Sequence, residues 1–237
     1  MSAFHHLLVL WSDPVTKRRH VVGHLWRTAD DGYAFAYDTD IEGALQAGFS
    51  LLPEFPAHRT LSDPYRSPTL FSTFAQRIPS SRRPDYFDIL KSWGVEHTED
   101  PMEILALSGG VQLTDRLELA EFRATDDDLT RPLQFRVAGE QFYSGAAALS
   151  QGDHVELRRE RDNAHDARAT QVRVVAGDVV GYVPRQYASI VARVLDSGRE
   201  LDAVAVRRLI LPQDRDRWVI RVQAKDRGTP ALREHAA

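Results

Sequence analysis

The sequence contains no cysteine. This absence excludes disulfide bonds, cysteine-ligated zinc, iron–sulfur clusters and thiol nucleophiles. The sequence also lacks any stretch approaching the roughly 18 uninterrupted apolar residues that span a bilayer. A short apolar run at residues 7–11 has no cationic region before it and no small-residue cleavage site, so we predict neither membrane insertion nor secretion. The composition fits a reducing compartment, and we predict a cytoplasmic protein.

The composition is that of a folded, globular protein, with 43% hydrophobic and 27% charged residues among 237. This length predicts one large domain or two small ones. The net charge of −4 hides an asymmetry, because residues 1–129 carry −8 and residues 130–237 carry +4. The basic groups of the second half are almost all arginine, which suits phosphate oxygens. Two explanations remain open here, a nucleic-acid partner or the codon usage of a GC-rich genome.

Residues 123–132 are the predicted junction between two domains. This segment carries three consecutive aspartates and ends in a proline, with little to bury. We therefore predict an N-terminal domain at 1–125, an acidic linker at 126–132, a second domain at 133–225 and a disordered tail at 226–237. The sequence has no internal repeat.

The first half is predicted to be an α+β domain. Tyr33, Phe35 and Tyr37 alternate with alanines, as in a strand, and Asp30-Asp31-Gly32 supplies a hairpin turn before them. The predicted strands are 7–11, 19–26 and 33–37, and the predicted helices are 69–77, 83–93 and 101–107.

The second half is richer in strand patterns. The predicted strands are 133–137, 153–159, 169–175, 179–183, 200–211 and 217–224, and residues 186–195 form the predicted helix. About six short strands in roughly 100 residues predict a small closed or half-closed barrel. Such a fold commonly binds ligands on one face.

Several residues of this half have the chemistry of a single-strand binding site. Phe142 and Tyr143 are adjacent rings beside a glycine, and bases stack on such rings while arginine meets phosphates. Arg158 ends a predicted strand and Arg185 begins the predicted helix. The polar loop between them offers Asn163 and Asp166 for sugar hydroxyls or base edges. A structural explanation stays open, with the rings in the core and the aspartate in a turn.

Residues 133–211 resemble the HIRAN domain, a family found in Swi/Snf-type DNA-repair helicases and in bacterial proteins. The resemblance rests on the aromatic pair, on the L-R-x-E-x-x-N-x-x-D-x-x-A arrangement from Leu157 to Ala169, and on the G-Y-V-P-R step at Gly181 to Arg185. It implies an OB-like barrel that captures the 3′ end of single-stranded DNA, with aromatics on the terminal bases and an aspartate on the 3′-hydroxyl.

Carried over by position, the resemblance assigns a role to each candidate. Asp166 reads the 3′ end and Phe142 and Tyr143 stack on bases, while Asn163 contacts a base or the loop and Arg185 contacts a phosphate. His165 stands where DNA-end-binding members have a tyrosine, and an imidazole stacks over less area. The complete predicted nucleic-acid site is Phe142, Tyr143, Arg158, Asn163, His165, Asp166, Tyr182 and Arg185.

The first half resembles the N-terminal subdomain of HipA-like toxin kinases over residues 5–120. The resemblance rests on the strand–turn–strand unit at 22–37, Leu51-Leu52-Pro53, Leu70-Phe71 and the segments 82–86 and 105–110. The kinase domain itself is absent, because the sequence has no glycine-rich phosphate loop and no catalytic Asp/Asn pair. The resemblance implies a regulatory or docking role for this half.

The sequence therefore predicts a non-catalytic protein that captures single-stranded DNA or DNA 3′ ends, without metal or cofactor. The alternative is a toxin–antitoxin-type regulator whose residues 1–125 bind a separately encoded HipA-like kinase. A nuclease or other hydrolase is disfavoured because no clustered acidic metal site can be assembled from the motifs.

Overall fold

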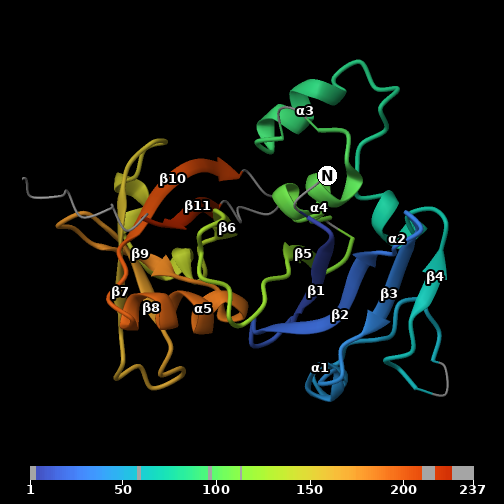
Figure 1. The fold of residues 1–237 in the computed structure, drawn as a ribbon, viewed down its shortest axis with the longest axis horizontal. Helices are drawn as coiled ribbons and strands as arrows, with labels where there is room; N and C mark the ends of the chain where they lie inside the picture. Colours follow the sequence, from blue (N-terminus) through green and yellow to red (C-terminus); the bar gives the residue numbers. More distant parts are fainter. Residues whose placement is uncertain (1–3, 58–59, 96–97, 113, 210–216, 226–237) are drawn as a thin grey trace, which may run out of the picture. The chain divides into compact units, whose positions relative to one another are not determined.

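The computed structural model describes residues 4–57, 60–95, 98–112, 114–209 and 217–225. The chain divides into two compact units between Phe122 and Arg123 (Figure 1), and each is described by itself. The predicted tail at 226–237 lies outside the described residues. Within the described part of the chain, no helix is both long enough and apolar enough to cross a membrane. The cytoplasmic location stays a prediction.

The first unit contains a five-stranded antiparallel sheet with the strand order β4-β3-β2-β1-β5. The strands are β1 (His6–Ser12), β2 (Arg19–Arg27), β3 (Tyr33–Tyr37), β4 (Tyr65–Ser67) and β5 (Leu117–Glu121). The three strands predicted near the N-terminus are present. Asp31 takes a φ of 61° in the predicted turn between β2 and β3, a left-handed conformation in which aspartate is enriched.

Short helices complete the described part of this unit, namely α1 (Glu42–Gln46), α2 (Ser72–Ala75), α3 (Tyr86–Ser92) and α4 (Pro101–Ser108). Helix α4 follows its sequence signals closely. The Asp100 carboxylate accepts a bond of 2.9 Å from the Met102 N–H, and Gly109 ends the helix at a φ of 76°. Helix α2 is shorter than the predicted 69–77, and it begins only at Ser72 because Phe71 has a non-helical ψ of 143°.

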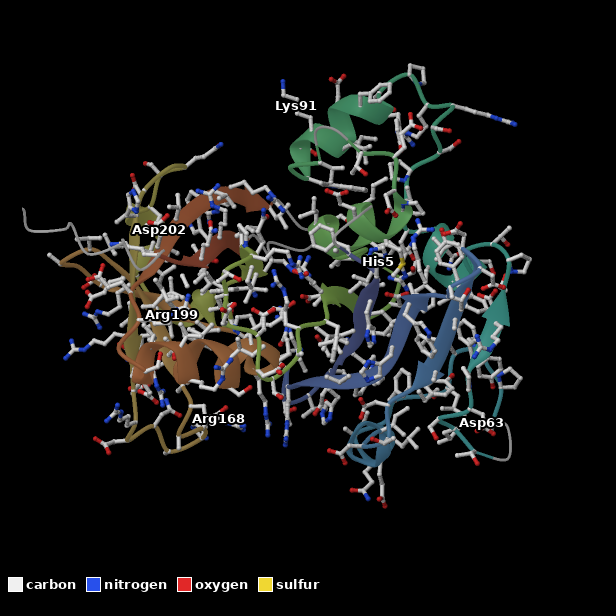
Figure 2. All side chains as sticks on the ribbon, viewed as in Figure 1. His5, Asp63, Lys91, Arg168, Arg199 and Asp202 are labelled. Atoms are coloured by element: carbon white, nitrogen blue, oxygen red, sulfur yellow. The ribbon has the colours of Figure 1, made fainter. Side chains whose placement is uncertain are left out.

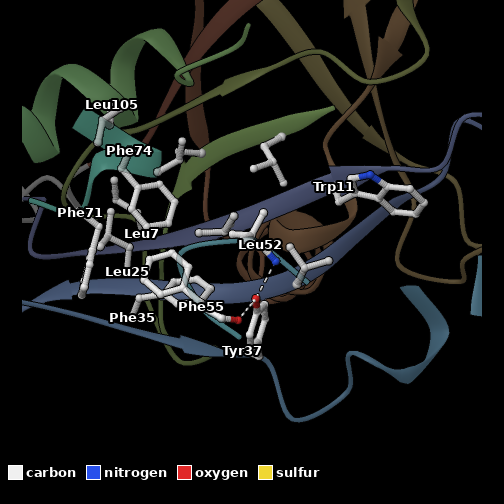
Figure 3. Close-up of a cluster of buried hydrophobic side chains, with 14 of the residues drawn as sticks. Leu7, Trp11, Leu25, Phe35, Tyr37, Leu52, Phe55, Phe71, Phe74 and Leu105 are labelled. Atoms are coloured by element: carbon white, nitrogen blue, oxygen red, sulfur yellow. Dashed lines mark hydrogen bonds between the residues drawn. The ribbon is translucent and has the colours of Figure 1, made fainter. Parts of the chain in front are cut away.

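Aromatic side chains fill the core on one face of the sheet (Figure 3). The Phe35 ring lies 4.2 Å from that of Phe55, measured between centroids. The Tyr37 hydroxyl donates to the Phe55 carbonyl and accepts from the Leu52 N–H, both at 2.8 Å. Burial raises the pKa of Tyr37 to about 12. Side chains alternate along a strand, so the residues between these rings face the opposite side, here called the outer face of the sheet.

The second unit is built from two three-stranded sheets, with the orders β10-β11-β6 and β7-β8-β9. The strands are β6 (Leu133–Arg136), β7 (Val155–Arg159), β8 (Thr170–Val174), β9 (Val179–Tyr182), β10 (Leu201–Leu209) and β11 (Arg217–Ala224). Isolated bridges join the sheets, Ala138 to Tyr182 and His154 to Val204. The fold class is confirmed, an α+β unit followed by a mainly-β unit.

Helix α5 (Arg185–Asp196) is the long helix of the second unit. The prediction of 186–195 differs from it by one residue at each end. Its apolar stripe is buried as the helical spacing predicts, including Tyr187, Ile190 and Val191. The helix covers the barrel-like core and leaves its first residue, Arg185, exposed.

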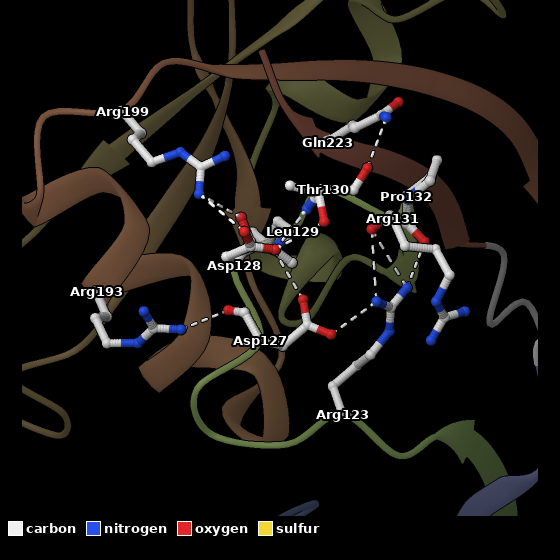
Figure 4. Close-up of polar contacts among 10 residues, drawn as sticks. All are labelled: Arg123, Asp127, Asp128, Leu129, Thr130, Arg131, Pro132, Arg193, Arg199 and Gln223. Carbon is white, nitrogen blue, oxygen red and sulfur yellow. Dashed lines mark hydrogen bonds and ion pairs between the residues drawn. The ribbon is translucent and has the colours of Figure 1, made fainter. Parts of the chain in front are cut away.

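The acidic segment, residues 126–132, lies in the second unit and is held against it (Figure 4). Leu129 is fully buried, and its carbonyl accepts a bond of 2.8 Å from the Ala224 N–H of β11. Arg193 of α5 donates to the Asp127 carbonyl, and Arg199 donates to the Asp128 carbonyl at 3.1 Å. The segment therefore does not have the structure of a free linker. The predicted boundaries themselves stay predictions.

Candidate nucleic-acid interface

Two exposed rings lie at the end of the short helix η1 (Glu140–Phe142), Phe142 as its last residue and Tyr143 directly after it. Phe142 is 75% exposed and Tyr143 is 37% exposed. The loop that carries them is anchored to β11, because the buried Glu140 carboxylate accepts a hydrogen bond of 2.8 Å from the backbone N–H of Trp218. The Trp218 indole N–H in turn donates to the Ala146 carbonyl at 3.0 Å, within the second short helix η2 (Gly145–Ala148). A fixed backbone thus presents large apolar side chains to solvent, which is typical of binding surfaces.

Tyr182 connects these rings to the sheet. Its ring centroid lies 5.8 Å from that of Tyr143, in an edge-on arrangement, and the two hydroxyls are 3.4 Å apart. The Tyr182 hydroxyl donates to a Glu160 carboxylate oxygen at 2.8 Å. Burial, followed by the bonds to Tyr143 and Glu160, raises the pKa of Tyr182. Tyr182 is therefore a protonated hydrogen-bond donor at neutral pH.

Glu160 links Tyr182 to the polar loop between β7 and β8. The Asn163 side-chain amide donates to the same Glu160 oxygen at 2.7 Å, and the Asn163 side-chain carbonyl accepts from the N–H groups of His165 and Asp166. Hydrogen bonds from Asn163 and then Tyr182 lower the pKa of Glu160. One continuous network therefore runs from Tyr143 to the backbone of the loop.

Asp166 stabilises the end of this loop. Its Oδ1 accepts from the Arg168 N–H at 2.8 Å and from the Arg168 side chain at 3.3 Å, and Arg168 projects from the loop in Figure 2. Burial raises the pKa of Asp166, but the bonds from Arg168 and the charge of Arg185 outweigh it and leave that pKa below its usual value. Among the described residues these bonds fall on Oδ1, so Oδ2 keeps the capacity to accept.

A row of side chains crosses the sheet beside the rings. Arg158 on β7 pairs with Gln171 on β8, and Gln171 pairs with Tyr182 on β9. Paired residues share a face, and this face is the solvent-facing one, because the alternate residues Thr170 and Val172 are buried. The Gln171 amide lies 3.5 Å from the Tyr182 hydroxyl. We call Phe142, Tyr143, Tyr182, Gln171 and Arg158 the aromatic face.

The predicted site residues thus fall into two neighbouring groups. Phe142, Tyr143, Tyr182 and Arg158 belong to the aromatic face, and Asn163, His165, Asp166 and Arg185 belong to the loop and the start of α5. Asn163 joins the groups through Glu160. Gln171 was not predicted as a site residue, although its outward position follows from the alternation of the strand. In the sequence, Glu160 is only one position of the L-R-x-E motif, because its bond to Tyr182 spans 22 residues.

The first residue of the G-Y-V-P-R motif, Gly181, is a glycine for a steric reason. A Cβ at this position would lie 2.5 Å from the Ala138 carbonyl oxygen, which no ordinary side chain tolerates. The close approach is the bridge between Ala138 and Tyr182, with N–H···O distances of 2.9 and 2.8 Å in the two directions. The glycine therefore lets β9 pass close to the end of β6, which brings Tyr182 beside Tyr143.

Comparison with known protein families agrees with this architecture. Residues 131–217 match the family model of the HIRAN domain, and residues 14–113 match that of the HipA N-terminal domain. Both resemblances predicted from the sequence are confirmed. No curated protein matches the chain significantly. The described residues hold no group of three or more histidine, aspartate or glutamate side chains arranged to bind a metal ion.

Two solved structures are similar to part of the chain. The HIRAN domain of human HLTF is 22% identical, with a TM-score of 0.35, and the match covers 40% of this chain and 76% of that one. A protein from Lactobacillus plantarum is also 22% identical, with a TM-score of 0.30, and the match covers 39% of this chain and 99% of that one.

Proposed function

We propose that the second unit binds single-stranded DNA, including DNA 3′ ends, and catalyses no reaction on it. The observation that carries this proposal is the aromatic face, where Phe142 and Tyr143 are exposed on an anchored loop beside Tyr182. An exposed ring on a rigid backbone is the platform that an unpaired base stacks on. The match of residues 131–217 to the HIRAN domain supports the same function.

The cations around the face suit the phosphates of such a strand. Arg158 and Arg185 are both exposed, one on the solvent-facing side of β7 and the other at the start of α5. Arg159 and Arg161, by contrast, are both paired with Asp196. Phosphate contacts made by Arg158 and Arg185 release counterions, so the affinity for DNA is expected to fall as the salt concentration increases.

The 3′ terminus is assigned to Asp166, whose Oδ2 remains able to accept a hydrogen bond. The lowered pKa keeps this carboxylate ionised at neutral pH. An ionised carboxylate accepts from a terminal hydroxyl and repels a terminal phosphate. His165, exposed at the adjacent position, lies where a ring can stack near the same end.

End recognition can be tested with Asp166→Asn. The wild-type protein is expected to bind a 3′-hydroxyl strand about tenfold more tightly than the same strand ending in a 3′-phosphate. Asp166→Asn should reduce this ratio, since an amide does not repel the phosphate. Asp162→Asn, an exposed residue of the same loop, is the matched control and should keep it. Equal wild-type affinity for the two ends, measured by fluorescence anisotropy, contradicts the assignment.

A second candidate function concerns the first unit, which matches the HipA N-terminal domain. Phe87 on α3 is 71% exposed and stands edge-on to Tyr86, at a centroid distance of 5.2 Å. Such a ring is a typical anchor in a protein interface. On this account residues 1–125 bind a separately encoded HipA-like kinase.

The kinase hypothesis makes its own prediction. Phe87→Ala should weaken co-purification of the full chain with a HipA-like kinase from the same organism, because the anchoring ring is lost. Val15→Ala, which changes another highly exposed apolar residue of the same unit, should not. Retention of the kinase by Phe87→Ala at the wild-type level would rule out this docking surface.

A further inference from the structure

The outer face of the first unit's sheet is hollowed beside β2. Trp26 and His24 stand on β2 directly opposite Ala34 and Ala36 of β3 in the strand register. Beside these two rings and the small Ala36 lies a cavity of about 520 Å³, which His5, His6 and Ser62 also line. His5, labelled in Figure 2, directly precedes β1. A volume of this size is within the range of small-molecule sites, roughly 300–1,000 Å³.

Three titratable side chains along this cavity form a chain of hydrogen bonds, here called the histidine relay. The Nε2 of His6 lies 2.9 Å from the Nδ1 of His24, and the Nε2 of His24 lies 2.8 Å from the Oδ2 of Asp38. All three residues line the cavity. They come from β1, β2 and the residue after β3, so the relay crosses the sheet from strand to strand.

The relay fixes the positions of its protons. The hydrogen bond from His24 lowers the pKa of Asp38, and burial, followed by the charge of His24, lowers the pKa of His6 to about 4. An ionised carboxylate only accepts, so the Nε2 of His24 carries a proton. In the form of the relay with both imidazole rings neutral, the Nδ1 of His24 accepts from the Nε2 of His6, which leaves the Nδ1 of His6 as a lone-pair acceptor. No described residue bonds that nitrogen.

Cations do not compete for this acceptor from the cavity wall. Arg27 also lines the cavity, but its guanidinium is paired with Asp100 at 2.8 Å and lies 5.1 Å from the Tyr33 ring centroid. Besides the hydroxyls of Thr39 and Ser62, the cavity therefore offers ring surfaces and the acceptor of His6. The ring of Trp26 stands 6.1 Å from that of His6, so both can border a planar molecule.

From these contacts we infer that this cavity is a second binding site, for a small planar heterocycle with N–H donors, such as a purine nucleoside. The heterocycle packs against Trp26 and donates a hydrogen bond to the Nδ1 of His6. Asp38 and His24 act as positioning residues, because they hold His6 in the tautomer that accepts. The site lies in the first unit and does not depend on DNA binding by the second.

Adenosine is a suitable probe, tested on the full chain carrying Phe142→Ala and Tyr143→Ala, so that stacking on those rings is removed. Saturable binding measured by calorimetry is expected, together with a shift of the His6 Nδ1 signal in ¹⁵N-resolved NMR. His6→Phe keeps a ring and removes the acceptor, so adenosine should bind about tenfold more weakly. N6,N6-dimethyladenosine, which lacks the exocyclic donors, should bind the unaltered cavity similarly weakly.

The matched control is His154→Phe, an exposed histidine of the second unit, which should leave the adenosine affinity unchanged. Ala36→Leu places a larger side chain opposite His24, which fills the cavity while all three residues of the relay are kept, and it should abolish binding even if His6→Phe does not fold. The absence of adenosine binding would overturn the inference. So would equal affinity of wild type and Ala36→Leu, or an unshifted His6 signal at saturation.

Discussion

Arg123→Met is expected to lower the free energy of unfolding of the second unit by about 3–5 kcal/mol, the typical cost of removing one partner of a buried ion pair. The Arg123 side chain is 1% exposed and donates to the Asp127 carboxylate at 2.9 Å. It also donates to the Pro132 carbonyl (Figure 4). Methionine fills a similar volume but leaves both acceptors without this donor. The Asp127 carboxylate would then be partly buried without its counterion.

Urea unfolding followed by tryptophan fluorescence measures this effect, because Trp218 is buried in the same unit. Arg161→Met is the matched control. Arg161 is 71% exposed on its side chain and pairs with Asp196 at the surface, where an ion pair contributes about 0–1 kcal/mol. Equal unfolding midpoints for the two variants would show that the contacts of Arg123 stabilise the second unit no more than a surface ion pair does.

Phe142→Ala and Tyr143→Ala are each expected to weaken single-stranded DNA binding by about 1–3 kcal/mol, a rise in Kd of roughly 5- to 150-fold. The rings are exposed, so their loss removes stacking area and leaves the core intact. Tyr143→Phe should retain most of the affinity, since the ring carries the stacking. Arg158→Ala should lower the slope of log Kd against log salt by about one unit, which is the signature of one phosphate contact.

Fluorescence anisotropy with a labelled single strand at several salt concentrations separates these contributions. Val175→Ala serves as the control, because Val175 is 60% exposed in the same unit and is not part of the aromatic face. If both ring variants bind like wild type while their melting curves are unchanged, the aromatic face is not the DNA-binding surface.

Much of the fold was predictable because its signals are local. Alternation at 33–37, the caps of α4 and the apolar stripe of α5 each depend on residues a few positions apart. The structure of the acidic segment was not predictable in this way. Its partners Arg193 and Arg199 lie 66 to 71 residues away along the chain, and three aspartates in a row have the composition of a linker.

The residue types of the candidate site were predictable from the sequence, but the exposure of its rings and the hydrogen-bond partners of its residues were not. Phe142 and Tyr143 were identified as rings, but a sequence does not distinguish an exposed ring from a core one. Exposure follows here from the anchoring of the loop by Glu140 and Trp218, which are 78 residues apart. The partnership of Gln171 with Tyr182 depends on the register of β8 and β9, including the bulge after Val172.

Across the β7-β8-β9 sheet, the row of solvent-facing side chains changes in chemistry from one end to the other. Arg158, Gln171 and Tyr182 sit on three successive strands, so their backbones are spaced by about 4.8 Å and the chemistry changes from cation to amide to ring. Tyr143 lies at the Tyr182 end of the row, and Phe142 precedes it in the chain. A nucleic-acid strand with its bases on the rings has its backbone at the arginine end of this row, where a phosphate can be bound. In the proposed function, the row therefore determines which side of a bound strand faces the rings and which side faces the arginine.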